Sequence, residues 1–512
     1  MSEDVALGGS TTTERTGTTA DRSAVVLIGL LLIAAFVMIL NETILSVALP
    51  TLMSDLDITA GTAQWLTSGF LLTMATVIPT TGYILQRFTL RSVYITAMSL
   101  FAAGTLLAAL APGFEVLLTA RVVQASGTAL MVPLLMTTIL NVIPEHSRGR
   151  TMGLVAIVIS VAPAVGPTTS GLILQSLSWR AMFWIVLPIA VGALVLGGLF
   201  VRNVTKPRPS HLDFISVPLS ALGFGGIVYG LSSIGESAGG HAPVPPWVPL
   251  VVGVIALALF VVRQLKLAGR DRALLDLRTF AVGPFRLAIM MMAGFMLTLF
   301  GALIILPLYL QNVLGKDVLT TGLVLLPGGL VMGLLAPFVG ALFDKFGARP
   351  LVLPGTVAVS AGTWLLTTLD ANSSLWMVIA AHVVLSTGIA FGLTPLMTSA
   401  LGSLAPELYS HGSATVSTIQ QVAGAAGTAL FITLMTRGTE SAIADGSDPV
   451  QAGADGVHTA FLVAGCLSIV LIVAAVLVRG PKQATMAGGA PDEHSPGSVE
   501  TEETADHQPK GV

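Results

Sequence analysis

Apolar stretches of about twenty residues, the length of a membrane-crossing helix, recur along almost the whole chain. In lipid, a backbone satisfies its own hydrogen bonds only as a helix or a closed barrel, and continuously apolar stretches of this length favour helices. Charged residues form only 10% of the 512 residues, whereas soluble domains have about 25%. We therefore expect an all-α polytopic membrane protein and exclude a globular enzyme with a single anchor.

Hydropathy predicts fourteen transmembrane helices with polar tails at both ends. We expect disordered tails at 1–23 and 479–512, and a longer, acidic external loop at 438–457. The first apolar run is long enough to span, so no cleavable leader is expected. The predicted spans are 24–51, 63–84, 92–111, 115–140, 151–174, 181–201, 213–234, 247–266, 284–311, 319–341, 350–370, 374–397, 410–436 and 458–478.

The Lys and Arg residues are sorted between alternate connections, which predicts the orientation. If the N-terminus is cytoplasmic, only Arg180, Lys316 and Arg437 fall in external segments, and Arg121 is the only basic residue deep within a span. A one-span error would scramble this sorting, so the sorting supports fourteen spans. We expect a multi-pass protein of a bacterial plasma membrane with both termini in the cytoplasm.

A short internal repeat divides the chain, because 82–91 aligns with 340–349. Each stretch follows the second span of a six-span unit, as in transporters built from parallel repeats. We expect six-helix bundles at 24–201 and 284–478, with two inserted helices and their cytoplasmic linkers at 202–283. The candidate gating residues of the repeated loops are Gly82, Arg87, Arg91, Gly340, Asp344, Lys345, Gly347 and Arg349. Asp344 is expected to cap a helix or bridge to a basic residue of the other half; the alternative is a solvated run of topogenic charges.

Glu42 is the only acidic residue deep in any predicted span. Because a charge in hydrocarbon costs roughly 2.5 to 3.5 kcal/mol on insertion scales, such groups are normally kept for a function. Arg121, in the fourth span, lies at a similar predicted depth, and Asn41 and Gln124 can donate hydrogen bonds beside the pair. We interpret Glu42 as a proton-coupling carboxylate whose charge responds to water access and to Arg121. The alternatives are a static ion pair, a polar brace or an arginine that snorkels.

Two further positions in the predicted spans have two interpretations each. The stretch 162–171 contains Gly166, Pro167 and Gly171 and is expected to bend against a partner helix, or else to serve only small-residue packing. His382 is expected to be a hydrogen-bonded packing residue, and the alternative is a second proton site.

Motifs for other chemistry are absent from the sequence. There is no G-x-x-x-x-G-K-[ST], no H-E-x-x-H and no basic-aromatic module for nucleic acid. The single cysteine, Cys466, excludes an internal disulfide and a cysteine metal cluster. We expect no enzyme activity, metal, cofactor or nucleic-acid partner, and a monomer driven by the proton gradient.

The chain resembles the major facilitator superfamily over nearly all of 24–478, in its fourteen-span drug:proton antiporter branch (EmrB/QacA-like). The span 1 signature is similar to 41–50 and places its acidic residue on Glu42. The signatures of spans 4 and 5 fall on Leu118, Arg121, Gln124 and Gly127, and on Gly166, Pro167 and Gly171. Where the first loop signature has Asp and Gly, this chain has Gln86 and Thr89.

Within that branch, the chain looks most like lincomycin-resistance type exporters. The resemblance implies proton-driven multidrug efflux of amphipathic small molecules by alternating access. It also implies that membrane lipid surrounds the protein. One alternative is export of an endogenous lipid, peptide or antibiotic metabolite by the same mechanism. An uptake carrier is a second alternative, and a membrane enzyme or sensor is disfavoured because no catalytic constellation is found.

Overall fold

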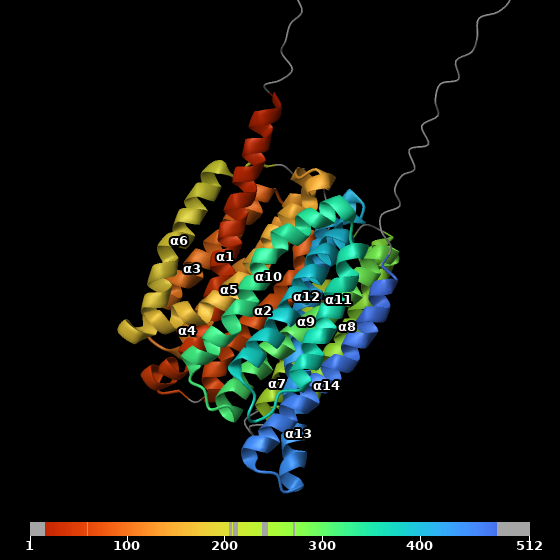
Figure 1. Ribbon diagram of the computed structural model, residues 1–512. Coiled ribbons are helices and arrows are strands. Elements are labelled where there is room, and N and C mark those ends of the chain that lie inside the picture. The colour runs from red at the N-terminus through yellow and green to blue at the C-terminus, as the bar shows by residue number, and fades with distance from the viewer. Residues whose placement is uncertain are drawn as a thin grey trace, which may run out of the picture. The chain divides into compact units, whose positions relative to one another are not determined.

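The structure is a computed structural model that describes residues 16–58, 60–203, 207, 213–237, 244–269 and 272–478. Within these ranges the chain forms helices and no strand (Figure 1). The α-helices are α1 (Thr16–Leu56), α2 (Ala60–Arg87), α3 (Leu90–Ala109), α4 (Phe114–Val142), α5 (Arg148–Ser176), α6 (Trp179–Phe200), α7 (Ser216–Ser237), α8 (Trp247–Ala268), α9 (Gly283–Leu308), α10 (Val318–Phe346), α11 (Arg349–Thr367), α12 (Leu375–Gly402), α13 (Tyr409–Ala444) and α14 (Pro449–Val476).

Twelve of these helices are long and apolar enough to cross a membrane, judged by length and composition over the described residues. The two that do not qualify are α5 and α7, and within α7 only Ser216–Leu231 forms a shorter apolar helix. Each of the fourteen predicted spans coincides with one α-helix. The helices are therefore where the sequence predicted them, but a count of fourteen membrane spans is not confirmed and stays a prediction.

Helix boundaries follow capping chemistry. The side chain of Asp317 accepts the N–H of Thr320 at the start of α10, and that of Ser374 accepts the N–H of Met377 at the start of α12. Such caps satisfy backbone donors that have no partner inside the helix. At the other end of α10, Gly347 adopts a φ of 79°, a left-handed conformation that glycine tolerates without strain.

Two expectations about boundaries were wrong. Helix α1 begins at Thr16, so 16–23 is helical and not part of a disordered tail; extending an existing helix needs no new nucleus. Helices α13 and α14 are separated only by 445–448, because most of the predicted loop 438–457 continues the two helices. Helix α5 is continuous through Gly166, and a bend of this helix stays a prediction. Residues 1–15 and 479–512 lie outside the described residues.

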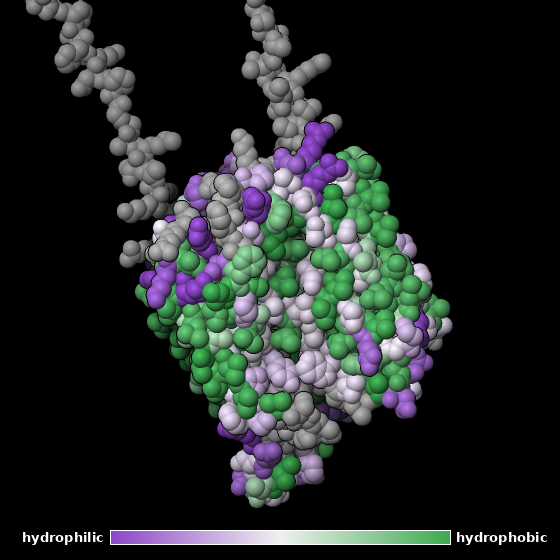
Figure 2. Space-filling view, turned by 180° about the vertical axis from the view of Figure 1, so that it is seen from behind, coloured by the Kyte–Doolittle hydropathy of each residue, from purple (hydrophilic) through white to green (hydrophobic). Residues whose placement is uncertain are grey.

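Helices α1–α6 and α9–α14 correspond to the two predicted six-helix bundles, which we call the two halves, and they contact each other along several lines. Helix α5 packs against α10, and α13 packs against both α2 and α4. One large apolar cluster joins buried residues of both halves, including Met136 of α4 and Met397 of α12. In Figure 2, apolar residues cover much of the face shown, and hydrophilic residues gather mainly near its ends. We call the end that carries Arg87, Arg148 and Lys345 the basic end.

At the opposite end, one cluster holds together the helices of the first half. Asp55, in the last turn of α1, accepts hydrogen bonds from Trp179 Nε1 at 2.7 Å and Arg180 Nη1 at 3.2 Å. Arg180 also donates to the carbonyl of Ala111, between α3 and α4. The hydrogen bond from Trp179, more than the charge of Arg180, lowers the pKa of Asp55. This cluster fixes α1, α6 and the α3–α4 connection relative to one another.

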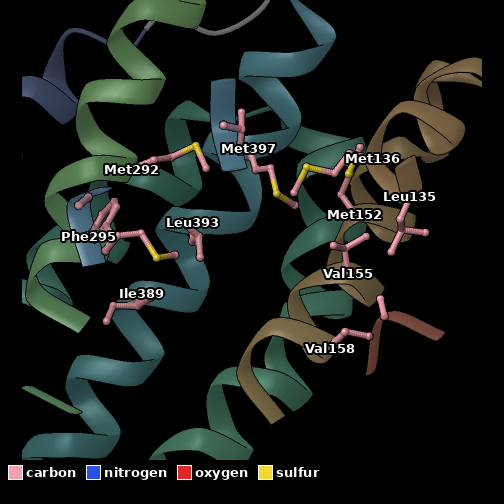
Figure 3. Packing of buried hydrophobic residues seen from close by; sticks show 14 of the residues in the cluster. Leu135, Met136, Met152, Val155, Val158, Met292, Phe295, Ile389, Leu393 and Met397 are labelled. Carbon is pink, nitrogen blue, oxygen red and sulfur yellow. The ribbon is translucent and has the colours of Figure 1, made fainter. Parts of the chain in front are cut away.

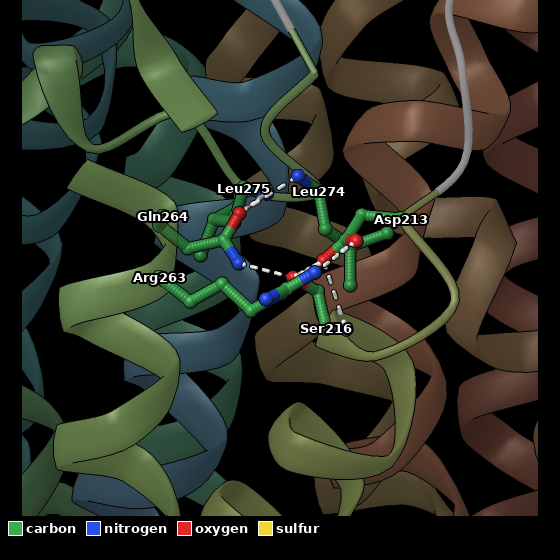
Figure 4. Close-up of polar contacts among 6 residues, drawn as sticks. All are labelled: Asp213, Ser216, Arg263, Gln264, Leu274 and Leu275. Atoms are coloured by element: carbon green, nitrogen blue, oxygen red, sulfur yellow. Dashed lines mark hydrogen bonds and ion pairs between the residues drawn. The ribbon is translucent and has the colours of Figure 1, made fainter. Parts of the chain in front are cut away.

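The hairpin of α7 and α8 is anchored at its basic end by a polar cluster, shown in Figure 4. Arg263 of α8 donates Nε and Nη2 to the two carboxylate oxygens of Asp213, each at 2.6 Å. Gln264 donates to Ser216 Oγ at 2.7 Å and accepts the backbone N–H of Leu274 at 2.8 Å. The cluster therefore joins both helices of the hairpin to the segment that leads into α9.

We expect Asp213→Asn to lower the melting temperature of the protein. The hydrogen bond from Arg263 lowers the pKa of Asp213 to about 2, below the value of about 3.9 in an unfolded chain. This stabilisation is therefore complete above about pH 4 and is lost as the pH falls toward 2. Since Arg263 is one-third exposed, we expect a loss of about 1 kcal/mol after solvent screening.

Differential scanning fluorimetry of the purified protein near neutral pH measures this loss. Asp57→Asn is the matched control, because Asp57 is exposed and has a φ of 52° that asparagine also tolerates. Equal melting temperatures for Asp213→Asn and the parent protein would contradict the prediction.

Candidate functional site

Arg121 is the centre of a buried polar cluster between α1, α2 and α4. Its side chain is fully buried, and Nη1 donates to Asn41 Oδ1 at 3.3 Å and to Gln124 Oε1 at 3.1 Å. Nε donates to the carbonyl of Leu66 at 3.3 Å, and the guanidinium lies 4.1 Å from the ring centroid of Phe70. The structure thus brings together Arg121, Asn41 and Gln124, which the sequence placed at similar depth.

A second layer holds Gln124 in place. Its Nε2 donates to Thr105 Oγ1 of α3 at 2.9 Å, and that hydroxyl in turn donates to the carbonyl of Phe101 at 2.7 Å. Gly104 makes room for this contact, because a Cβ there would lie 2.7 Å from Gln124 Cγ. The orientation of Arg121 is therefore fixed by three helices besides its own.

Glu42 is the charged neighbour of this cluster. Its carboxylate and the Arg121 guanidinium interact electrostatically, yet they form no ion pair within 4 Å in the described part of the chain. Arg121 Nη2 is buried and has no hydrogen-bond partner among the described residues. Glu42 itself is partly exposed, whereas Arg121 is not. The site therefore has an unused donor near the carboxylate of a partly exposed glutamate.

The residue after Glu42 carries the contact between α1 and α5. A Cβ at Gly166 would overlap the side chain of Thr43, and Thr43 Oγ1 donates to the carbonyl of Ala162 at 3.5 Å. Among the described residues, no atom lies within 4 Å of the position of a Cβ at Gly171. Of the three residues predicted to form a bend, Gly166 therefore lies at a close helix contact and Gly171 does not. The side chain of Pro167 lies outside the described residues.

At the basic end, Asp344 connects the two halves. Its Oδ1 accepts the backbone N–H of Gly149 at 2.6 Å, and its Oδ2 accepts that of Arg150 at 2.8 Å. A carboxylate of α10 thus caps the N-terminus of α5, where the helix dipole favours negative charge. The two helices approach closely here because Gly340 has no side chain: a Cβ at this position would overlap the carbonyl of Gly149. Helix capping is the first of the two roles that the sequence suggested for Asp344.

The repeat-related loop makes a different contact. Gln86, at the position equivalent to Asp344, donates Nε2 to the carbonyl of Glu407 at 3.0 Å, just before α13. Gly82 lies against α13, and a Cβ there would be 2.7 Å from His411 Nδ1. Both loops therefore contact the start of the fifth helix in the other half, but only Asp344 does so with a charge.

The other predicted gating residues contact their own half or solvent. Arg91 donates Nη2 to the carbonyl of Gly198 at 2.6 Å, within α1–α6. Lys345 lies 5.3 Å from the ring centroid of Phe346. Arg87 and Arg349 are exposed. These four do not bridge the halves in this structure.

Residues that the sequence analysis did not single out also join the halves. Arg148 donates Nη1 to Tyr409 Oη at 3.4 Å, and Thr137 Oγ1 donates to Ser413 Oγ at 3.0 Å. All ten residues from Tyr409 to Thr418 are buried, although seven of them carry a polar group in the side chain. The sequence signal that could have indicated this contact is the run of polar residues at the start of the predicted span 410–436. The structure is therefore closed between the halves at the basic end.

Methionines occupy the apolar part of this closed contact. Met136 and Met152 come from α4 and α5, Met292 and Met397 from α9 and α12, and all four are at most 1% exposed. Figure 3 shows Met397 and the pair Met136 and Met152 directed toward one another from the two halves. Methionine side chains repack easily because they are unbranched and polarisable. The methionine surface between the halves can therefore repack when the neighbouring helices move apart.

Further along the helices are buried polar atoms without partners among the described residues. They include His382 Nδ1 on α12 and Gln420 Nε2 on α13. His382 packs against Gly328 of α10 and near Ser386. Neither of the two interpretations of His382 is decided by these contacts.

The sequence profile of the Major Facilitator Superfamily matches residues 31–428. The chain belongs to the major facilitator superfamily. It is 42% identical over 456 residues to lincomycin resistance protein LmrB of Listeria monocytogenes, covering 88% of this chain and 96% of that one. It is 30% identical over 410 residues to a multidrug resistance protein B homolog of Mycobacterium tuberculosis, covering 80% of this chain and 75% of that one.

Among solved structures, the human organic anion transporter MFSD10 (TETRAN) superposes with a TM-score of 0.62 at 14% identity. The match covers 87% of this chain and 99% of that one, and it supports the superfamily fold alone. The chain is therefore a multi-pass membrane transporter with bacterial relatives, and not an enzyme. Its relatives named for drug resistance imply small-molecule substrates.

Proposed function

We propose that this protein is a proton-driven antiporter that exports amphipathic small molecules, with lincomycin-like antibiotics as the first candidates. The observation that carries the proposal is the carboxylate of the partly exposed residue Glu42 near the unused donor of buried Arg121. An ionisable pair at this depth is costly and is normally kept for a function. The two relatives named for resistance to lincomycin or to many drugs support the substrate class.

In this mechanism, Glu42 binds a proton from the external side while the basic end is closed. A neutral Glu42 no longer attracts Arg121, which keeps its hydrogen bonds to Asn41, Gln124 and Leu66. When substrate arrives from the cytoplasmic side, Glu42 releases the proton and its carboxylate takes Arg121 Nη2. Transport follows because each ligand favours a different state of the same two-state protein.

Helix α5 links this switch to the other half. Thr43 adjoins Glu42 and packs on Gly166 of α5, and α5 lies along α10. A small shift of α1 at Glu42 therefore acts on a contact between the halves. The methionine surface of Figure 3 would separate as the basic end opens and present flexible apolar side chains to substrate.

The proposed topology has fourteen spans, α5 and α7 included, with the basic end and both termini in the cytoplasm. The sorting of Lys and Arg residues supports this orientation. Figure 1 shows the N-terminal end of α1 and the α13–α14 connection at opposite ends of the helices, as this topology requires.

Everted membrane vesicles that contain the protein test the function. An inside-acid pH gradient is expected to drive lincomycin into the vesicles, and an uncoupler is expected to stop the uptake. Uptake that persists after the gradient has collapsed would contradict proton coupling. Unchanged lincomycin susceptibility of an expressing host, together with a cell product that accumulates on deletion, would favour export of an endogenous metabolite.

We expect Gly166→Leu to reduce lincomycin uptake in this assay by about tenfold or more, because the added side chain forces α5 away from Thr43. Gly171→Leu is the matched control on the same helix, since no atom of the residues that the structure describes lies within 4 Å of its Cβ position. Its uptake is expected to stay near that of the parent protein. Equal uptake by the two variants at equal expression would show that the contact between α1 and α5 has no role in transport.

A further inference from the structure

We propose that the α7–α8 hairpin closes one side of the transporter to lipid, so that membrane-dissolved substrate enters between the halves only on the other side. The closed side is where α2 meets α13, which we call the α2–α13 side. The open side is where α5 meets α10, the α5–α10 side. The route for substrate rests on the proposed function, whereas the difference between the two sides does not.

An apolar cluster that includes both halves and the hairpin covers the α2–α13 side. Helix α7 packs against α2 of one half and α13 of the other. The cluster joins Ala75 of α2, Phe224 of α7, Phe260 of α8 and Ala414 of α13. Val422 of α13 packs against the same cluster. Lipid that approached the line between α2 and α13 would therefore meet α7 first.

Close contacts fix α7 on α2. A Cβ at Gly225 would lie 3.1 Å from Leu72 Cδ1 and 3.3 Å from Thr76 Oγ1, so the helix backbone approaches α2 closely. Further along, the rings of Trp65 and Tyr229 stack with centroids 5.5 Å apart. Two separate contacts along α2 therefore hold α7 against it.

The hairpin is also fixed to the second half. Gln264 of α8 accepts the backbone N–H groups of Leu274 and Leu275, at 2.8 and 3.3 Å, in the segment before α9 (Figure 4). Both leucines are buried in the cluster that covers the α2–α13 side. Because the hairpin is attached to both halves, it stays over this side when the halves move.

The α5–α10 side is built differently. The two helices meet through small residues: a Cβ at Gly153 would lie 2.6 Å from Pro337 Cα, and Gly333 lies against Val161. Among the described long helices, only α12 also packs on both α5 and α10, and most of its length is buried. Figure 1 shows α5 and α10 side by side.

Apolar side chains next to this contact are open to the surroundings. Leu334 and Phe338 of α10 are 63% and 69% exposed, and Leu154 of α5, beside Gly153, is 37% exposed. Helices joined through glycine separate without first disengaging long side chains. A small separation here would expose the space between the halves directly to lipid, where amphipathic compounds accumulate. If α2 and α13 separated by the same amount, the space between the halves would face α7 and not lipid.

Accessibility of two single cysteines tests this difference. Val161→Cys on the α5–α10 side and Val422→Cys on the α2–α13 side are made in a Cys466→Ser background and reconstituted in liposomes. The probe is N-(1-pyrenyl)maleimide, which dissolves in the bilayer. Each reaction rate is compared with and without Asp344→Asn, which removes the charge that connects α10 to α5.

We expect Asp344→Asn to raise the rate at Val161→Cys by about fivefold or more and the rate at Val422→Cys by less than about twofold. No rise at Val161→Cys, or an equal rise at Val422→Cys, would overturn the proposal. Phe224→Ala removes a ring from the cluster over Val422. In the Phe224→Ala background, Asp344→Asn is therefore expected to raise the reaction rate at Val422→Cys as well, and its effect on the rate at Val161→Cys is expected to stay the same. The assay contains no substrate, so its result is independent of whether lincomycin is transported.

Discussion

Glu42→Gln is expected to lower pH-driven lincomycin uptake into everted vesicles by about 100-fold, to the background of empty vesicles. Glutamine has nearly the same shape as protonated glutamate but cannot release a proton. The variant would fold normally, because Arg121 keeps Asn41, Gln124, the carbonyl of Leu66 and the ring of Phe70. Without a titrating carboxylate, the proton gradient has no group through which to favour one state of the transporter.

A second measurement separates lost coupling from lost binding. Exchange of radiolabelled for unlabelled lincomycin across the membrane, with no gradient, is expected to persist in Glu42→Gln because it needs no net proton movement. Glu42→Asp, which still titrates, is the matched control and is expected to retain part of the driven uptake. If Glu42→Gln transports at the parent rate when a pH gradient is imposed, Glu42 is not the coupling group.

The sequence predicted the helices and the composition of the site because both depend on local properties. Length and hydropathy placed fourteen helices, since a span needs about twenty apolar residues. Counting residues from the ends of two spans placed Arg121 at the depth of Glu42, because rise per residue is constant in a helix. The hydrogen bond from Arg121 to Asn41 agrees with that depth.

What the sequence did not predict depends on which helices become neighbours. The carbonyl of Leu66 and the ring of Phe70 belong to α2, and their contact with Arg121 follows from the packing of α2 against α4. The position of α7 between α2 and α13 likewise depends on cluster packing that no single-helix pattern contains. Asp344 was ambiguous because a carboxylate in a loop can cap a helix or pair with a base, and only the position of α5 decides between them.

Asp344→Asn is expected to reduce driven uptake by about tenfold. Each carboxylate oxygen of Asp344 accepts one backbone N–H, from Gly149 and from Arg150. Asparagine offers a single oxygen, and its NH2 group would face the remaining N–H donor. Loss of one hydrogen bond and of the charge at the start of α5 costs about 1 to 2 kcal/mol. The closed basic end, which the proposed cycle needs for proton binding from outside, is destabilised by that amount.

Asp317→Asn is the matched control for this loss, because it lies on the same helix and also caps an N-terminus. Asp317 accepts the N–H of Thr320 within α10 itself, and asparagine is as good an N-cap as aspartate. Its uptake is therefore expected to equal that of the parent protein. Vesicle uptake at matched expression measures both variants. Equal uptake by the two would mean that the cap between α10 and α5 does not hold the basic end closed. A selective loss in Asp344→Asn would mean that closing this end depends on the charged cap that Asp344 places on α5, because Gln86 makes the repeat-related contact to Glu407 without a charge.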